Sequence, residues 1–437
     1  MRQTAASRLA LVLSAGLAAA AGSARGELTE VPVDLRFGVG TRNNNLIQFQ
    51  LEAAPRWDVT HGDRGNIVAS ARLRLDGRDL LEPGEPKFEN YASLSKPITL
   101  GDAGTLEIRD LYYEHLLDRG RLRFGKQQIV WGLLDGVKIL DVVNPQTFRE
   151  FILDDLEDSR IGLWSAYADL SFGEWRAEFV VIPDNTSHDI PDQGAWFELK
   201  APRFRYGAPV GSSGLPSYVE RDGDGFSDLA AGVRLSTTIS SVDISALAYS
   251  GQDHAPLGRL TVDNGTAAVE QFFRRRNVLG VSAESAFGPI AWRTELAHQP
   301  DRTFNTRDFA GLDTVELDQT TLGVGADVAL PLDVLANVQV VWDQVHDAPA
   351  TLVRPDEDKL FTLFLRRSFA YETLRTELRW YHSLTDHDDT IVATVSYDIS
   401  DETSAYVSSE WFSGTPEGLF GQFAAQDRIY LGLAHYF

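Results

Sequence analysis

The chain has 437 residues, no cysteine and a formal net charge of −23, with 40 basic and 63 acidic side chains. The absence of cysteine excludes disulfide bonds, thiolate metal sites and thiol nucleophiles. The acidic balance argues against nucleic acid as a partner, because no excess of Lys and Arg is available to neutralise phosphates.

The first 24 residues have the features of a secretory signal peptide. Arg2 and Arg8 give a positive start, residues 9–21 are mainly apolar, and the small residues 22–24 form a cleavage site. The apolar run is shorter than the roughly 20 residues that a membrane-spanning helix needs. We therefore predict a signal peptide over 1–24 and one mature domain over 25–437.

Period-two alternation dominates the mature chain. In residues 321–330 (TLGVGADVAL) apolar side chains alternate with Gly323, Gly325 and Asp327, and residues 334–343 repeat the pattern after a short turn. Alternation of this kind places apolar groups on one face of a strand and polar groups on the other. A periplasmic sheet protein with one wet face is the alternative interpretation.

Short and long connections between these segments alternate along the chain. This is typical of outer-membrane barrels, which have short periplasmic turns and long extracellular loops. Counting hairpins from the C-terminus predicts an all-β fold, an antiparallel up-and-down transmembrane β-barrel of about 18 strands. The expected location is the outer membrane of a Gram-negative bacterium. Residues 185–227 are expected to form a long extracellular loop.

The last segment alternates up to a terminal aromatic residue, Phe437. It resembles the C-terminal signal that the barrel-assembly machinery recognises, although His435 stands where an apolar residue is usual. The expected partners are this machinery, outer-membrane lipid and lipopolysaccharide. The sequence leaves open whether three barrels associate into a homotrimer, because trimer faces and lipid faces are both apolar.

Barrels of about 16 to 18 strands enclose an aqueous lumen, so polar strand positions should line a pore. An excess of arginine on this wall predicts a preference for anions, whereas pairing with acids on neighbouring strands is the structural alternative. The predicted pore-lining arginines are Arg72, Arg74, Arg121, Arg123, Arg176, Arg234, Arg293, Arg375 and Arg379.

Residues 131–160 do not alternate and mix apolar side chains with acids. A loop this apolar should be buried, and the lumen is the available space, so we predict an inward-folded constriction; a loop over the outer rim is the alternative. A helical turn is expected after Asn144-Pro145, where Asn can cap and Pro suits the first helical position. The predicted site residues are Trp131, Asp141, Asn144, Pro145, Phe148, Glu150, Asp154 and Asp155.

The same region carries a family resemblance. Gly125-Lys126-Gln127, Trp131-Gly132, Asp141 and Asn144-Pro145 resemble a signature with a G-K/R-Q, W-G, N-P pattern in large uncharacterised proteobacterial outer-membrane proteins. The resemblance covers about twenty residues around this loop, together with the barrel texture. It implies a porin-like barrel and names no substrate.

Two acidic loops could in principle hold metals. Glu220, Asp222, Asp224 and Asp228 are spaced like the oxygen ligands of a calcium loop, with a solvated acidic loop as the alternative. Histidines and acids at 382–389 could bind zinc, but a plain polar loop explains them better. No cofactor is required by the sequence.

No nucleophile elbow, phosphate-binding loop or other catalytic motif is present, so we do not expect an enzyme. The leading hypothesis is a porin-like channel for passive or facilitated diffusion of small polar or anionic solutes. The alternative is a plugged outer-membrane transporter of an apolar, fatty-acid-like or lipid-like molecule. Phe148, Phe151 and Ile152 facing an apolar pocket would favour this alternative.

Overall fold

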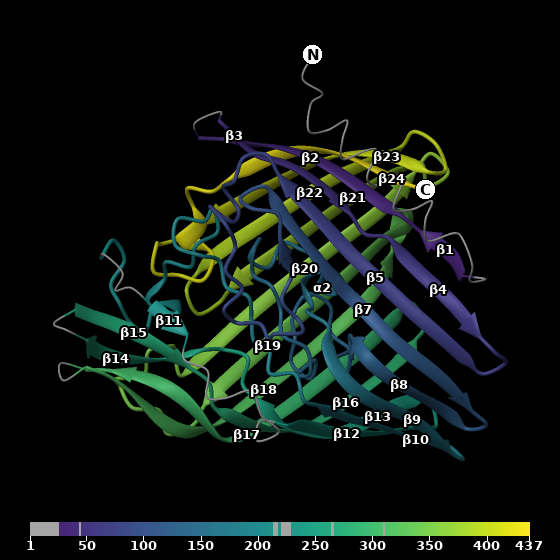
Figure 1. Cartoon of the computed structure of the whole chain (residues 1–437), viewed down its shortest axis with the longest axis horizontal. Coiled ribbons are helices and arrows are strands. Elements are labelled where there is room, and N and C mark those ends of the chain that lie inside the picture. The colour runs from purple at the N-terminus through teal and green to yellow at the C-terminus, as the bar shows by residue number, and fades with distance from the viewer. Residues whose placement is uncertain (1–25, 43–44, 213–216, 220–228, 264–265, 309–310) are drawn as a thin grey trace.

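The computed structural model describes residues 26–42, 45–212, 217–219, 229–263, 266–308 and 311–437, and its strands form a closed antiparallel barrel of 18 strands (Figure 1). The predicted signal peptide and the predicted calcium loop lie outside these residues. The barrel strands are β2 (Pro32–Gly40), β3 (Leu46–Ala53), β5 (Gly65–Asp76), β7 (Gly104–Leu117), β8 (Gly120–Gln127), β9 (Leu163–Phe172), β10 (Trp175–Ile182), β12 (Ala230–Ile239), β13 (Val242–Gln252), β16 (Arg275–Phe287), β17 (Ile290–Arg307), β18 (Leu312–Leu330), β19 (Val334–Val345), β20 (Glu357–Phe369), β21 (Leu374–Ser383), β22 (Asp388–Asp398), β23 (Thr403–Ser413) and β24 (Arg428–Tyr436).

Pairing of the first and last strands closes the barrel. Strand β2 is antiparallel to β24, with Pro32 opposite Tyr436 and Gly40 opposite Arg428. Two further strands, β1 (Gly26–Glu30) and β4 (Arg56–His61), pair with each other and prolong β2 and β3 at the same end. Because a closed barrel has no free edge, the predicted barrel is confirmed and the open sheet of a periplasmic protein is excluded.

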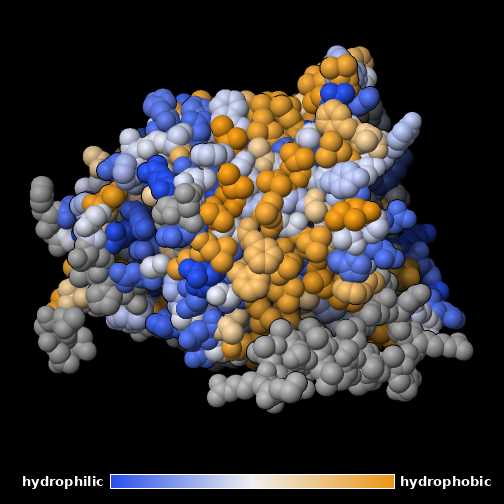
Figure 2. Space-filling model, turned by 90° about the horizontal axis from the view of Figure 1, so that it is seen from above, coloured by the Kyte–Doolittle hydropathy of each residue, from blue (hydrophilic) through white to orange (hydrophobic). Residues whose placement is uncertain are grey.

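The outer face of the barrel is apolar. Val324, Val340 and Leu431 are 50%, 46% and 57% exposed, whereas Gln339, which points the other way on β19, is 1% exposed. Figure 2 shows hydrophobic side chains gathered across the middle of one outer face. A closed sheet with an apolar outer belt and polar inward positions is the architecture of Gram-negative outer-membrane proteins, as predicted.

The remaining elements are short and lie within the connections. A three-stranded sheet stands at the long-loop end beside the extended β17–β18 hairpin (Figure 1). No helix in the described part of the chain is long and apolar enough to cross a membrane. These elements are β6 (Ile98–Thr99), β11 (Ser217–Val219), β14 (Leu257–Asp263), β15 (Thr266–Phe272), α2 (Leu156–Ser159) and the 3-10 turns η1 (Pro202–Phe204), η3 (Pro331–Asp333) and η4 (Gly421–Phe423).

Two apolar clusters fill part of the barrel interior. The first joins Trp131, Leu140 and Val143 to wall residues such as Leu247 and Val278. The second, which we call the aromatic core, gathers loop residues around the wall side chains of β21–β23. Its members are Leu81, Phe151, Leu153, Phe197, Tyr381, Val392, Phe412, Phe420 and Phe423. Loops from four different connections therefore fold inward.

Candidate functional site: the barrel lumen

Residues 131–160, which we call the lumen loop, cross the barrel interior and are held first by the wall of β12–β17. Glu295 on β17 is fully buried and accepts backbone N–H groups of the lumen loop, from Leu140 at 2.9 Å, from Leu134 at 3.2 Å and from Leu133. Arg234 donates to the carbonyl of Trp131 at 3.1 Å. A single inward carboxylate therefore binds three loop amides that have no strand partner.

Glycines on this wall let the lumen loop approach closely. A β-carbon added at Gly280 would lie 2.4 Å from Leu140, and one added at Gly323 would lie 2.4 Å from Leu134. Any larger side chain would displace the loop, because the inner wall and the loop are in direct contact. Loop side chains therefore pack directly against the inward glycines of the alternating strands.

The far end of the lumen loop is held by the opposite wall. Arg72 and Arg109 both donate to the carbonyl of Asp158, at 2.9 and 2.7 Å. Arg428 on β24 pairs with Glu150 at 2.5 Å. Burial raises the pKa of the Glu150 carboxyl, but the cationic groups of Arg428 and its neighbours outweigh this effect and lower that pKa to about 2. The lumen loop therefore bridges two walls with polar contacts at both ends.

The helical turn expected after Asn144-Pro145 does not form there, and this prediction is wrong. The Asn144 side chain accepts the N–H of Ile129 at 2.8 Å and donates to the carbonyl of Ile161 at 2.7 Å. The amide thus ties together the two ends of the lumen loop, so it does not cap a helix. The short helix α2 begins at Leu156 instead.

The residues of the G-K/R-Q, W-G, N-P pattern lie at the root of the lumen loop. Gly125 has φ of +136°, and a β-carbon there would lie 2.1 Å from the carbonyl oxygen of Leu111. Lys126 is buried and donates to the carbonyl of Ser95 at 3.4 Å. Asp141 pairs with Arg160 at 2.7 Å. These positions give the pattern a structural role in leading the chain from the wall into the lumen.

Two histidines from neighbouring connections, the buried His254 and the partly buried His188, hold the middle of the lumen loop. His188 accepts the N–H of Gln146 through Nδ1 at 3.0 Å, and His254 Nε2 lies 3.1 Å from the carbonyl oxygen of Val143. Burial lowers the pKa of His254 to about 4 and lowers that of His188 well below its usual range. Both rings are therefore neutral at pH 7, which matches their roles as acceptor and donor.

A cavity of about 1340 Å³ lies beside the lumen loop. Its lining extends from Arg203 and Arg354 in the long connections to Gly288 and Pro289 in a short turn at the other end of the barrel. More than half of the lining residues are apolar, and the charged ones are balanced, seven basic (Lys138, Arg203, Arg293, Arg302, Arg354, Arg366, Arg379) against seven acidic (Asp135, Asp154, Asp155, Asp253, Asp327, Asp358, Glu377).

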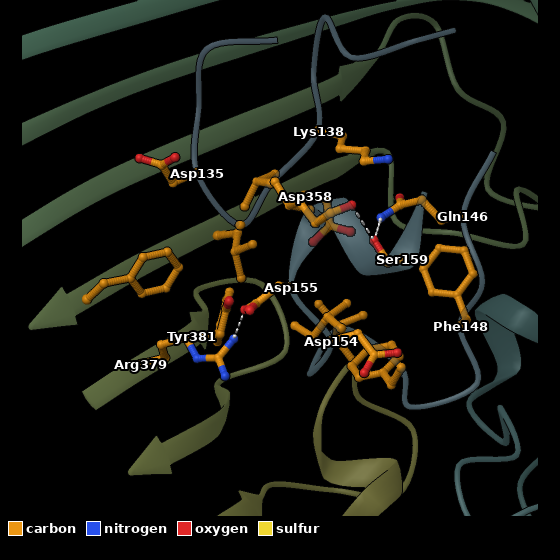
Figure 3. A pocket seen from close by; sticks show the side chains of 18 of the residues that line it. Asp135, Lys138, Gln146, Phe148, Asp154, Asp155, Ser159, Asp358, Arg379 and Tyr381 are labelled. Carbon is orange, nitrogen blue, oxygen red and sulfur yellow. Dashed lines mark hydrogen bonds and ion pairs between the residues drawn. The ribbon is translucent and has the colours of Figure 1, made fainter. Parts of the chain in front are cut away.

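Figure 3 shows the middle of this cavity. Arg379 and Tyr381 come from strand β21 of the wall, and Asp154 and Asp155 from the lumen loop. Arg379 pairs with Asp155 at 3.3 Å and with Glu377 at 3.1 Å. Burial raises the pKa of the Asp154 carboxyl to about 6. The loop and the wall are therefore in direct contact beside the cavity through groups of opposite charge.

Every arginine predicted to line the pore is engaged by a carboxylate. Only Arg293 and Arg379 line the cavity; the other seven are part of the wall around it. The pairs are Arg72–Glu107, Arg74–Glu52, Arg121–Asp169, Arg123–Glu114, Arg176–Asp169, Arg234–Glu178, Arg293–Asp327, Arg375–Asp398 and Arg379–Glu377. Eight of these pairs join neighbouring strands, as in the structural alternative, whereas Arg379 and Glu377 lie on the same strand, β21.

The predicted residues of the lumen loop fall into two groups, those that line the cavity and those with buried side chains. Phe148, Asp154 and Asp155 line the cavity, whereas the predicted residues with buried side chains hold the loop. Those are Trp131, Asp141, Asn144, Pro145 and Glu150.

The alternation of apolar and polar residues did not reveal several cationic residues that line the cavity. Arg203 lies in η1, Arg354 in the connection before β20, and Arg302 directly after a register shift in the pairing of β17 with β18. Local sequence pattern carries no signal for such positions, because a long connection can fold toward or away from the lumen.

The acidic loop at 382–389 is structural in the described part of the chain. Asp388 accepts the N–H groups of Phe420 and Gly421 at 2.7 and 2.8 Å, and Asp386 pairs with Arg203 at 2.6 Å. Among the described residues no group of three His, Asp or Glu side chains could hold a metal ion. These acids anchor the 414–427 connection instead.

Solved structures with a similar fold include two proteins of Acinetobacter baumannii. OccAB4 superposes with a TM-score of 0.50 at 9% identity, covering 93% of this chain and 97% of that one. OccAB3 gives 0.50 at 7% identity, covering 94% and 99%. At these identities the likeness concerns the fold alone. No curated protein matches the chain. A family model matches residues 74–434, so the chain belongs to the family described as "Protein of unknown function (DUF1302)".

Proposed function

We propose that this protein is an outer-membrane channel through which small solutes diffuse. The observation that carries the proposal is the cavity beside the lumen loop, whose lining extends from the long connections to a short turn at the opposite end of the barrel. A barrel of 18 strands is wide enough to leave an aqueous path even with a loop inside it. The lumen loop is then the part that sets the aperture.

The charge of the lining bears on which solutes pass. Seven basic and seven acidic residues line the cavity, and Arg293 and Arg379 on its wall are paired with carboxylates. Paired charges of both signs favour polar and zwitterionic solutes without excluding either ion, because no net field of one sign fills the path. The expected charge preference is therefore weaker than an arginine-rich wall alone would produce.

Single-channel recording of the refolded mature protein in a planar bilayer tests the proposal. We expect discrete open steps in potassium chloride and a reversal potential close to zero across a salt gradient. A matched preparation of heat-denatured protein controls for leakage. A correctly folded barrel that gives no steps would contradict the channel, and a strongly anion-selective potential would contradict the neutral lining.

A further inference from the structure

The cavity contains an apolar patch that the passage of ions does not require. The patch is formed by side chains that line the cavity and belong to, or pack against, the aromatic core. Besides the buried rings of Phe151 and Phe420, it consists of Ile152, Leu199, Leu360, Phe364, Tyr381 and Leu419. Of these six, all but Tyr381 are only partly buried, so apolar surface faces the cavity. Exposing such surface to water is unfavourable unless something covers it.

Strand register places the patch between charged groups. Strands β20 and β21 are paired with Leu360 opposite Ser383 and Phe364 opposite Arg379. Two residues from Leu360, toward the long loops, Asp358 pairs with Arg203 at 2.7 Å. Two residues from Phe364, toward the short turns, Arg366 stands opposite Glu377. The path therefore passes charge, apolar surface and charge in that order.

Both charged ends of the patch carry both signs. At the outer end Arg203 faces Asp358, and at the inner end Arg379 lies 3.1 Å from Glu377 (Figure 3 shows Asp358, Arg379 and Tyr381). A cation or an anion would each find an opposite partner at either end. Pockets that bind small molecules combine an apolar lining with a few placed polar groups in this way.

We propose that the apolar patch binds the apolar body of small amphipathic solutes in transit, while their charged end of either sign stays beside the flanking ion pairs. The proposal rests on the proposed channel function and names its solute class. Hydrocarbon tails, rather than head-group charge, would then decide which solutes are retained in the pore. Sugars and small inorganic ions would pass without being held.

Charge-matched pairs of ions that differ only in their tails test the proposal in planar bilayers. The probes are hexanesulfonate against methanesulfonate and hexyltrimethylammonium against tetramethylammonium. Both hexyl ions should block the current at a concentration on the order of tenfold lower than their short partners, because each buried methylene adds to affinity. Equal block within each pair, or block that follows only the sign of charge, would overturn the proposal.

Matched variants locate the effect. Ile152→Ser and Phe364→Ser should remove most of the tail-dependent block. Val137→Ser is the control, because Val137 is also a partly buried aliphatic residue of the lumen loop that lines the cavity but packs against the other apolar cluster. Retention of the tail effect in both patch variants, or its equal loss in the control, would count against the patch.

A folded barrel that gives no conductance steps would contradict the proposed channel. The apolar patch would then be tested by measuring whether it binds the probe. Saturation-transfer NMR on protein in lipid nanodiscs, with hexanesulfonate as the probe, reads contact with the hexyl chain directly. A signal that falls in Phe364→Ser but not in Val137→Ser supports the patch. A signal unchanged by all three substitutions would come from lipid and would overturn it.

Discussion

At the scale of single residues, the lumen is organised by ion pairs rather than by free charges. Arg293 and Arg379 are the two predicted arginines whose side chains line the cavity, and both are held by carboxylates. The partner carboxylates Asp327 and Glu377 are 37% and 40% exposed, and a partly exposed ion pair contributes little to stability, so its removal changes the local field more than the fold. Charge substitutions on the wall can therefore report which positions solutes approach.

Arg375 and Arg379 provide a matched comparison, since both lie on β21 and both are paired, but only Arg379 lines the cavity. We expect Arg379→Gln to shift the reversal potential toward cations and Arg375→Gln to shift it less, although each removes one positive charge. The measurement is the reversal potential in a salt gradient. Equal shifts would mean that ions follow a path other than the cavity.

At the scale of elements, the lumen loop is held by groups that lie far away in sequence. Glu295 binds its first part, and His188 and His254 bind its middle. Burial disfavours the charged form of both rings, and a protonated His188 could no longer accept the N–H of Gln146, so protonation would destabilise this arrangement. A histidine whose folded pKa is lowered contributes stability above its unfolded pKa of about 6.5 and loses it progressively as the pH falls from that value to the folded pKa.

We therefore expect the backbone amides of residues 143–148 to exchange faster with solvent at pH 4 than at pH 7, after correction for intrinsic rates. In the double variant His188→Asn and His254→Gln this difference should shrink, because the amides keep an acceptor and a donor but cannot titrate. Hydrogen exchange read by mass spectrometry is the measurement.

The double variant, measured at both pH values, also serves as the control for pH effects that do not come from the two histidines. Burial raises the pKa of the nearby Asp189 carboxyl to about 7 and of Asp154 to about 6, so these groups favour the folded loop at low pH and oppose the histidines. Wild type and double variant both retain these carboxyl groups. Subtracting the variant's change in exchange rate between pH 7 and pH 4 from that of wild type therefore isolates the contribution of the histidines. An identical pH dependence in wild type and variant would contradict it.

At the scale of the whole molecule, the barrel is closed by β24, which ends at Tyr436 beside β2. Phe437 follows with 76% of its surface exposed, so its side chain adds little to the folded barrel. Deleting Phe437 should reduce the amount of protein in the outer membrane of cells but leave refolding into detergent unchanged. Heat-modifiability on gels measures both, and defective refolding in vitro would contradict a role limited to assembly.

The barrel was predictable because its information is local. Alternation in 321–330 correctly assigned Gly323 to the inner face and Val324 to the outer one, since successive residues of a strand point to opposite sides. Turn spacing gave the strand number for the same reason. The apolar texture of 131–160 could be recognised as needing burial. Asn144 was misassigned because its partners, Ile129 and Ile161, are set by how the loop ends meet.

The sequence by itself determined a closed, outward-apolar barrel with a loop too apolar for solvent, because strand periodicity and solvent preference act over a few neighbouring residues. Only the tertiary structure decided that Glu295 binds three loop amides, that nine wall arginines are paired, and that Leu360 and Phe364 meet Ile152 around one cavity. The contacts of Glu295 and the cavity shared by Ile152 and Phe364 join residues more than a hundred positions apart, and most of the arginine pairs join different strands. Their geometry depends on barrel closure and register, which no local pattern encodes.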